Sequence, residues 1–117
     1  MKNFPNRSDV TEFPQGFEII PARSTTETEP DYIIPTGPAT RVYTFSKTSG
    51  TVSTLALTMW AHVDGEWYAQ STTDDGDALT SGNQVREWVV HPNTLIGFTV
   101  STISGGGTVA VRVRGFE

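Results

Sequence analysis

Two histidines are the residues of this chain best suited to acid–base chemistry near neutral pH, and they are His62 and His91. A Ser-His-Asp or Cys-His arrangement also needs a nucleophile and a group that orients the imidazole. His62 stands in a predicted strand opposite a tryptophan, and His91 precedes Pro92 in a predicted turn. The sequence contains no GxSxG, HExxH or P-loop motif. We therefore predict no catalytic residues, and a protein that is not an enzyme.

Carboxylates gather in "TTDDGDAL", where Asp74, Asp75 and Asp77 could supply oxygen ligands to Ca²⁺. Their spacing is not that of an EF-hand, and the Glu that closes such a loop is missing. A solvated acidic loop is therefore favoured over a calcium site. The chain has no cysteine, which excludes disulfides and cysteine-based zinc sites. We predict neither a metal nor a cofactor.

The dipeptide Asp64-Gly65 predicts a tight β-hairpin, because both positions of a type I′ turn take positive φ. The implied register pairs His62 with Trp67 and leaves the aliphatic side chains on the opposite face. Trp60, His62 and Trp67 then share one face, with Trp88 as a further aromatic candidate. These rings form either a stacking platform for sugars or a surface that packs against a second sheet, the arm or another subunit. The packing role is favoured.

The C-terminal segment "SGGGTVAVRVR" has a glycine run like those of phosphate-binding loops, but such loops lead into a helix. Here an alternating, strand-like pattern follows, so we interpret residues 104–107 as a hairpin loop. The register places the apolar side chains on one face: Phe98, Val100, Val109, Val111 and Val113. Arg112 and Arg114 lie on the other face. They either remain solvated and protect the strand, or they meet acidic groups of a neighbouring subunit.

The bulk composition excludes several classes of partner. The chain of 117 residues has a net charge of −5, with its eight Lys and Arg scattered, so nucleic acid is not an expected partner. No apolar run reaches the roughly 18 to 20 residues that span a bilayer, so a membrane is not expected either. The N-terminus lacks the apolar core of a signal peptide, which predicts synthesis in the cytoplasm.

Prolines divide the chain into two parts, because six of the seven lie within the first 38 residues. Proline lacks an amide proton and favours extended backbone, so residues 1–40 are predicted to form an extended N-terminal arm. Apolar residues are expected to anchor this arm on its own domain or on a neighbour: Phe4, Phe13, Phe17, Ile19, Ile20, Tyr32 and Ile33. The stretch "STTETEP" (24–30) is expected to be its most mobile part.

Residues 41–117 carry a β pattern throughout, with short Val-, Thr- and aromatic-rich runs separated by turn residues. No helical period and no βαβ unit interrupts it. The sequence predicts an all-β domain, an antiparallel β-sandwich of jelly-roll type. Such a domain body is marginally stable alone, so burial of the arm in an assembly would add stability.

Three segments, "LTMWAHVDGEWYAQ", "LTSGNQV" and "FTVSTISGGGTVAVRVRGFE", resemble the small β-sandwich virion structural proteins of tailed bacteriophages. The resemblance covers about residues 42 to 116. It implies a capsid decoration (cement) protein on the exterior of the virion that binds between subunits of the major capsid protein as a homo-oligomer, often a trimer. A head–tail accessory, tail or neck component is an alternative within the same class. A carbohydrate-binding host-recognition module that uses Trp60, His62 and Trp67 is the alternative outside it.

Overall fold

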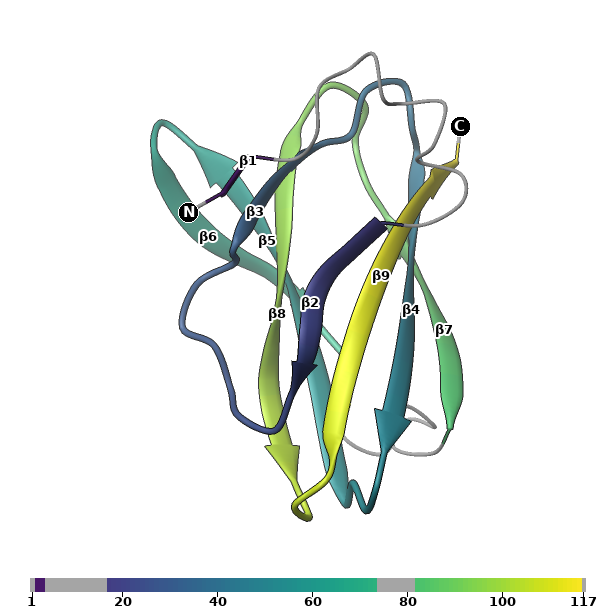
Figure 1. Ribbon diagram of the computed structural model, residues 1–117. Helices are drawn as coiled ribbons and strands as arrows, with labels where there is room; N and C mark the ends of the chain where they lie inside the picture. The colour runs from purple at the N-terminus through teal and green to yellow at the C-terminus, as the bar shows by residue number, and fades with distance from the viewer. Residues whose placement is uncertain (1, 4–16, 74–81, 117) are drawn as a thin grey trace.

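Two β-sheets packed face to face make up the protein (Figure 1). The computed structural model describes residues 2–3, 17–73 and 82–116, and this part of the chain contains strands and no helix. The strands are β1 (Lys2–Asn3), β2 (Phe17–Arg23), β3 (Tyr32–Pro35), β4 (Arg41–Ser49), β5 (Thr54–Val63), β6 (Glu66–Thr72), β7 (Asn83–Val89), β8 (Leu95–Ser104) and β9 (Thr108–Phe116). The predicted β-sandwich is confirmed.

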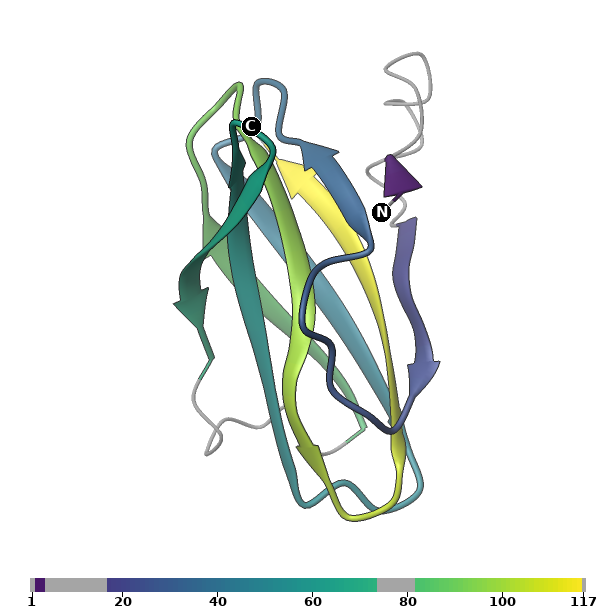
Figure 2. The same ribbon diagram turned by 90° about the vertical axis from the view of Figure 1, so that its left-hand side faces the viewer.

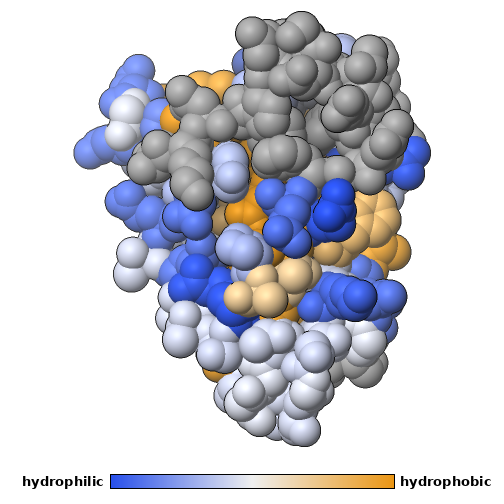
Figure 3. All heavy atoms as spheres, viewed as in Figure 1, coloured by the Kyte–Doolittle hydropathy of each residue, from blue (hydrophilic) through white to orange (hydrophobic). Residues whose placement is uncertain are grey.

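The strands are divided between a sheet of order β1-β3-β8-β5-β6, called sheet I here, and one of order β2-β9-β4-β7, called sheet II. All neighbours pair antiparallel except the two-residue strand β1, which pairs parallel with β3. The chain passes repeatedly from one sheet to the other. The end of the molecule that holds the β4–β5 and β8–β9 connections is rich in Ser, Thr and Gly, and it is nearly neutral in hydropathy in Figure 3.

Alternate residues of the central strands fill the space between the sheets. The fully buried apolar side chains are Ile20, Ile34, Val42, Leu55, Leu57, Met59, Ile96, Val100, Val109, Val111 and Val113. Trp88 joins this core with 5% of its surface exposed and packs edge-on against Phe98, with ring centroids 5.2 Å apart. Its indole N–H donates to the Thr44 hydroxyl at 2.9 Å, which satisfies the one polar group of the ring. Trp88 is therefore a core residue and does not belong to the surface aromatic group.

The hairpin at Asp64-Gly65 is confirmed, because both residues take positive φ, 52° and 82°. The pairing follows the predicted register from Val63–Glu66 to Trp60–Ala69. It then shifts: Met59 pairs with Ser71, so Gln70 is an extra residue on β6. Such a β-bulge locally bends the strand that carries the extra residue.

The predicted hairpin between β8 and β9 is wrong. β8 pairs with β3 and β5 in sheet I, whereas β9 pairs with β2 and β4 in sheet II. The glycine loop therefore crosses between the sheets. The predicted sorting of apolar and polar side chains still holds, because the valines of β9 face Phe98 and Val100 of β8 across the core instead of lying beside them. Gly107 is needed there, since an added Cβ would lie 2.6 Å from the backbone oxygens of Ser49 and Thr51.

Residues 17–40 lie against the sandwich itself. β2 forms one edge of sheet II, and β3 lies between β1 and β8 in sheet I. Of the predicted anchors, Ile19 and Ile20 are buried, Tyr32 and Ile33 are half-buried, and Phe17 begins β2. Phe4 and Phe13 lie outside the described residues. The described part of the arm therefore lies on its own domain.

The connection from β2 to β3 crosses from one sheet to the other along the side of the molecule (Figure 2). Glu27 attaches residues 24–30 to β8, although the sequence predicted these residues to be the most mobile part of the arm. Its backbone N–H donates to the Val100 carbonyl at 3.0 Å, and the Val100 N–H donates to its Oε1 at 3.1 Å. Arg23 forms an ion pair with the same carboxylate at 3.2 Å. Burial raises the pKa of Glu27 above its ordinary value, although the Val100 N–H and Arg23 act against this.

Candidate interaction surfaces

The residues predicted to form an interface or ligand face lie on opposite sides of the sandwich. Trp60, His62 and Trp67 come from β5 and β6 and point away from the core of sheet I. Arg112 and Arg114 come from β9 and point away from the core of sheet II, since Val111 and Val113 point inward. The two groups therefore form two separate surfaces, one on each sheet.

The aromatic surface of sheet I is held by contacts within the protein. The Trp60 indole N–H donates to the Thr99 hydroxyl at 2.9 Å across β5 and β8. The rings of His62 and Trp67 meet edge-on, with centroids 4.6 Å apart and planes at 60°. All three aromatic side chains are half-buried. Their geometry is that of cross-strand packing partners.

Gly97 on β8 provides the space for this packing. A Cβ at this position would lie 2.6 Å from the Pro30 Cβ and 2.7 Å from the Trp67 Cη2. The Trp67 ring and the buried Pro30 therefore rest directly on the glycine backbone. The Trp67 Nε1 is buried and has no hydrogen-bond partner among the described residues. The ring thus packs on β8 beside Pro30, and its polar edge does not face solvent.

The outer surface of sheet II has a different composition. Its basic side chains come from β4 and β9, its aromatic residues from β4 and its valines from β7, and the sheet register sets them in rows. The outward residues of this surface, called the Arg face here, are Glu18, Arg41, Tyr43, Phe45, Lys47, Val85, Glu87, Val89, Ala110, Arg112 and Arg114. Four of the chain's eight basic residues, Arg41, Lys47, Arg112 and Arg114, lie on it. An acidic protein thus carries half of its positive charges on one sheet face.

The Arg face combines ordered polar groups with exposed apolar ones. Val85 and Val89 on β7 are 57% and 72% exposed. The Tyr43 hydroxyl donates to the Glu87 carboxylate at 2.8 Å, and Arg41 lies 3.7 Å from the same carboxylate. The hydrogen bond to Glu87 raises the pKa of Tyr43, so its phenol keeps the proton. These contacts hold the Tyr43 ring across the face, between Arg114 and Glu87 in the register.

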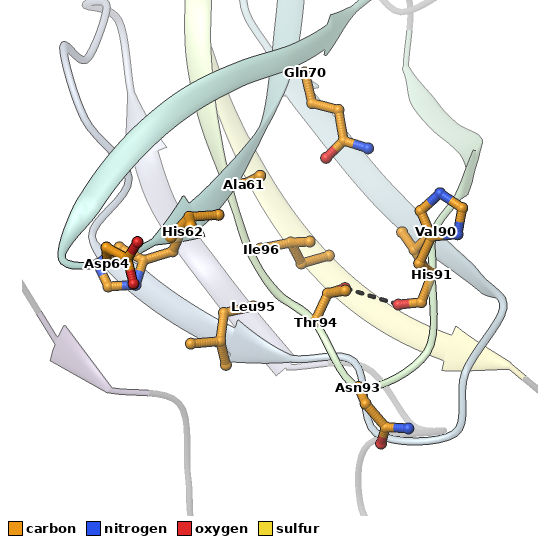
Figure 4. A pocket seen from close by; sticks show the side chains of 11 residues that line it. Ala61, His62, Asp64, Gln70, Val90, His91, Asn93, Thr94, Leu95 and Ile96 are labelled. Carbon is orange, nitrogen blue, oxygen red and sulfur yellow. Dashed lines mark hydrogen bonds between the residues drawn. The ribbon is translucent and has the colours of Figure 1, made fainter.

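A cavity of about 490 Å³ opens at the end of the sandwich, beside the β5–β6 hairpin (Figure 4). Its lining residues are Ala61, His62, Val63, Asp64, Gln70, Val90, His91, Asn93, Thr94, Leu95 and Ile96. In Figure 4 Ile96 lies at the middle of the lining residues, with Gln70, His91 and Asn93 around it. The sequence did not indicate this cavity, because the turn that follows β7 meets the hairpin only in the folded protein.

The two histidines lie at different parts of this cavity. His62 packs on Trp67, and the backbone carbonyl of His91 accepts hydrogen bonds from the hydroxyls of Thr36 at 3.0 Å and Thr94 at 2.7 Å. Among the described residues no three His, Asp or Glu side chains stand close enough together to hold a metal ion. The Asp74–Asp77 cluster lies outside the described residues.

Comparison with protein-family models found no match, and comparisons with curated proteins and with solved structures found none either. Within the part of the chain that the structure describes, no helix has the length and hydropathy that a membrane crossing requires.

Proposed function

We propose that the protein is a non-enzymatic structural component of a bacteriophage virion, and that it decorates the capsid by attaching through the Arg face. The observation that carries the proposal is the composition of that face, where four basic side chains flank Tyr43 and Phe45 and two exposed valines lie along one edge. The resemblance of residues 42 to 116 to small β-sandwich virion proteins supplies the partner class, the major capsid protein.

The physical character of the Arg face suits a protein partner. Arginine, tyrosine and phenylalanine are enriched at protein interfaces, because they combine large contact areas with directed hydrogen bonds. The exposed valines add apolar area at one side of the face, beside the charged rows. A partner of acidic surface would pair with Arg112 and Lys47, which are exposed. The overall charge of −5 would repel such a partner elsewhere, so charge also orients the docking.

A capsid-binding assay tests this proposal. Capsids assembled from the major capsid protein of the same phage are mixed with the full chain and sedimented. The fraction of the chain that sediments with the capsids is then measured. Arg112→Glu is expected to weaken binding at least tenfold, because it reverses a charge in the centre of the face. The double variant Ser24→Glu, Thr28→Glu is the control, since it makes the same change in net charge at two exposed positions away from the Arg face.

Equal binding by Arg112→Glu, the control and the wild type would reject the Arg face as the attachment surface. Binding to purified tails or necks instead of capsids would move the protein to that part of the virion. Sedimentation equilibrium of the free protein tests the trimer that the resemblance implies.

The carbohydrate-binding alternative has less support. A stacking platform needs a flat ring face open to a sugar, and Trp67 instead packs on Gly97 beside Pro30. A glycan array that gives hits with the wild type and none with Trp67→Ala would favour that alternative over the capsid proposal.

A further inference from the structure

The edge strands on the two sides of the sandwich differ in how accessible they are to a further strand (Figure 2). On one side, β2 contains Pro21, and β3 contains Pro35 and pairs with β1. On the same side, the backbone N–H of Glu27 donates to the Val100 carbonyl of β8. Proline lacks the N–H that a further strand would need, so Pro21 hinders strand addition along β2, and β1 and Glu27 occupy positions beside β3 and β8. On the other side β6 and β7 end their sheets and contain neither proline nor glycine.

β6 is the more accessible of these two edges. It pairs with β5 alone among the described residues, and every residue from Tyr68 to Thr72 is exposed. Its ladder is regular from Glu66 to Ala69, up to the bulge at Gln70. The unpaired backbone groups of such an edge can accept an extended segment as a further strand.

The cavity lies beneath this edge. Val63 on β5 and Leu95 on β8 line it and are 50% and 40% exposed. Tyr68 pairs with Ala61, another lining residue, and is itself 53% exposed. Side chains of a strand alternate between its two faces, so every second side chain of an added strand would point toward the cavity. Exposed apolar groups beside an open edge thus offer both backbone pairing and side-chain burial.

The charged residues around the cavity opening indicate which kind of segment would bind there. The lining contains one carboxylate, Asp64, and no lysine or arginine, and Glu66 begins the open edge. We propose that β6 binds an extended segment of another protein, one that carries apolar side chains at alternate positions and Lys or Arg at the end that lies beside the β5–β6 turn. The segment adds to sheet I as a strand, its apolar side chains enter the cavity, and its basic end meets Asp64 and Glu66. This surface is independent of the Arg face.

The proposal is tested with a synthetic peptide, acetyl-Lys-Thr-Phe-Thr-Val-Thr-Lys-amide, titrated into the isotope-labelled full chain. Two-dimensional NMR is expected to show shifts of backbone amides in β6 and around the cavity. Two control peptides carry N-methyl groups, one on its threonines and the other on its Phe and Val. Since alternate amides of a strand point to the same edge, one control should bind at least tenfold more weakly than the other.

Two similarly exposed valines provide matched protein variants. Val63→Lys places a cation in the cavity lining and is expected to weaken peptide binding at least tenfold, whereas Val85→Lys on the Arg face leaves it unchanged. Absence of binding, equal binding by both methylated peptides, or equal loss in both variants would overturn the proposal. Pairing of two copies through β6, seen as a dimer in sedimentation that excludes the peptide, would overturn it as well.

Discussion

The two outer faces of the sandwich both carry bulky residues on neighbouring strands, but among the described residues these side chains are packed differently on the two faces. On sheet I the Trp67 ring rests on Gly97 beside Pro30, and the Trp60 N–H is satisfied by Thr99. On sheet II no described segment crosses the centre of the Arg face, and Arg112, Val85 and Val89 are exposed. The aromatic residues of sheet I thus pack within the fold, whereas the mixed basic and apolar face of sheet II keeps exposed side chains.

Truncating one side chain on each face should distinguish a residue that stabilises the fold from one that does not. Of the changes considered, it should have the largest effect on the free energy of unfolding. Trp67→Ala removes a half-buried ring that contacts Gly97 and His62, so we expect it to lower the free energy of unfolding by about 2 to 3 kcal/mol. Arg112→Ala should change it by less than about 0.5 kcal/mol, as for exposed residues generally. Urea denaturation measures both. Equal losses would show that the Arg face also stabilises the fold.

The glycine beneath the aromatic group gives the next effect. Gly97→Ala places a Cβ against Pro30 and Trp67, so one of them must move, and overpacking of this kind costs about 1 to 3 kcal/mol. Ala110→Val, on the outer face of sheet II, is the control and should be nearly neutral. Thermal unfolding of the two variants checks the difference. An unchanged midpoint in Gly97→Ala would mean that residues 24–31 do not pack on β8 in solution.

The smallest effect concerns Glu27, which holds residues 24–31 on β8. Because its folded-state pKa is raised above 4.5, the folded protein binds the proton more tightly than the unfolded chain does. The stability that this provides is fully present below pH 4.5 and is lost as the pH rises through the folded-state pKa. Glu27→Gln keeps an acceptor for the Val100 N–H and removes the titration. We therefore expect the stability of the wild type, relative to Glu27→Gln, to fall as the pH rises over this window.

Urea denaturation at a series of pH values from 4 to 7 measures how this difference in stability changes with pH. Glu29→Gln, an exposed neighbour, controls for the loss of one negative charge. A slope of opposite sign would mean that the ion pair with Arg23 outweighs the cost of burying the carboxylate.

Local patterns determined several features of this protein. Asp64-Gly65 predicted its hairpin and register because positive φ at two successive positions permits few other turns. Alternation along β8 and β9 predicted which side chains are buried, since a strand places successive residues on opposite faces. The same pattern put Arg112 and Arg114 on the outer side of their strand.

Only the tertiary structure decided which strands are neighbours. Alternation specifies the face of a side chain but not its sheet, so a crossing between sheets and a hairpin give the same sequence pattern at residues 104–107. For the same reason the sequence could not place the Trp and Arg groups on opposite sides, bury Trp88, or bring the turn after β7 to the β5–β6 hairpin to form the cavity. These features depend on contacts between distant segments, which local composition and periodicity do not encode.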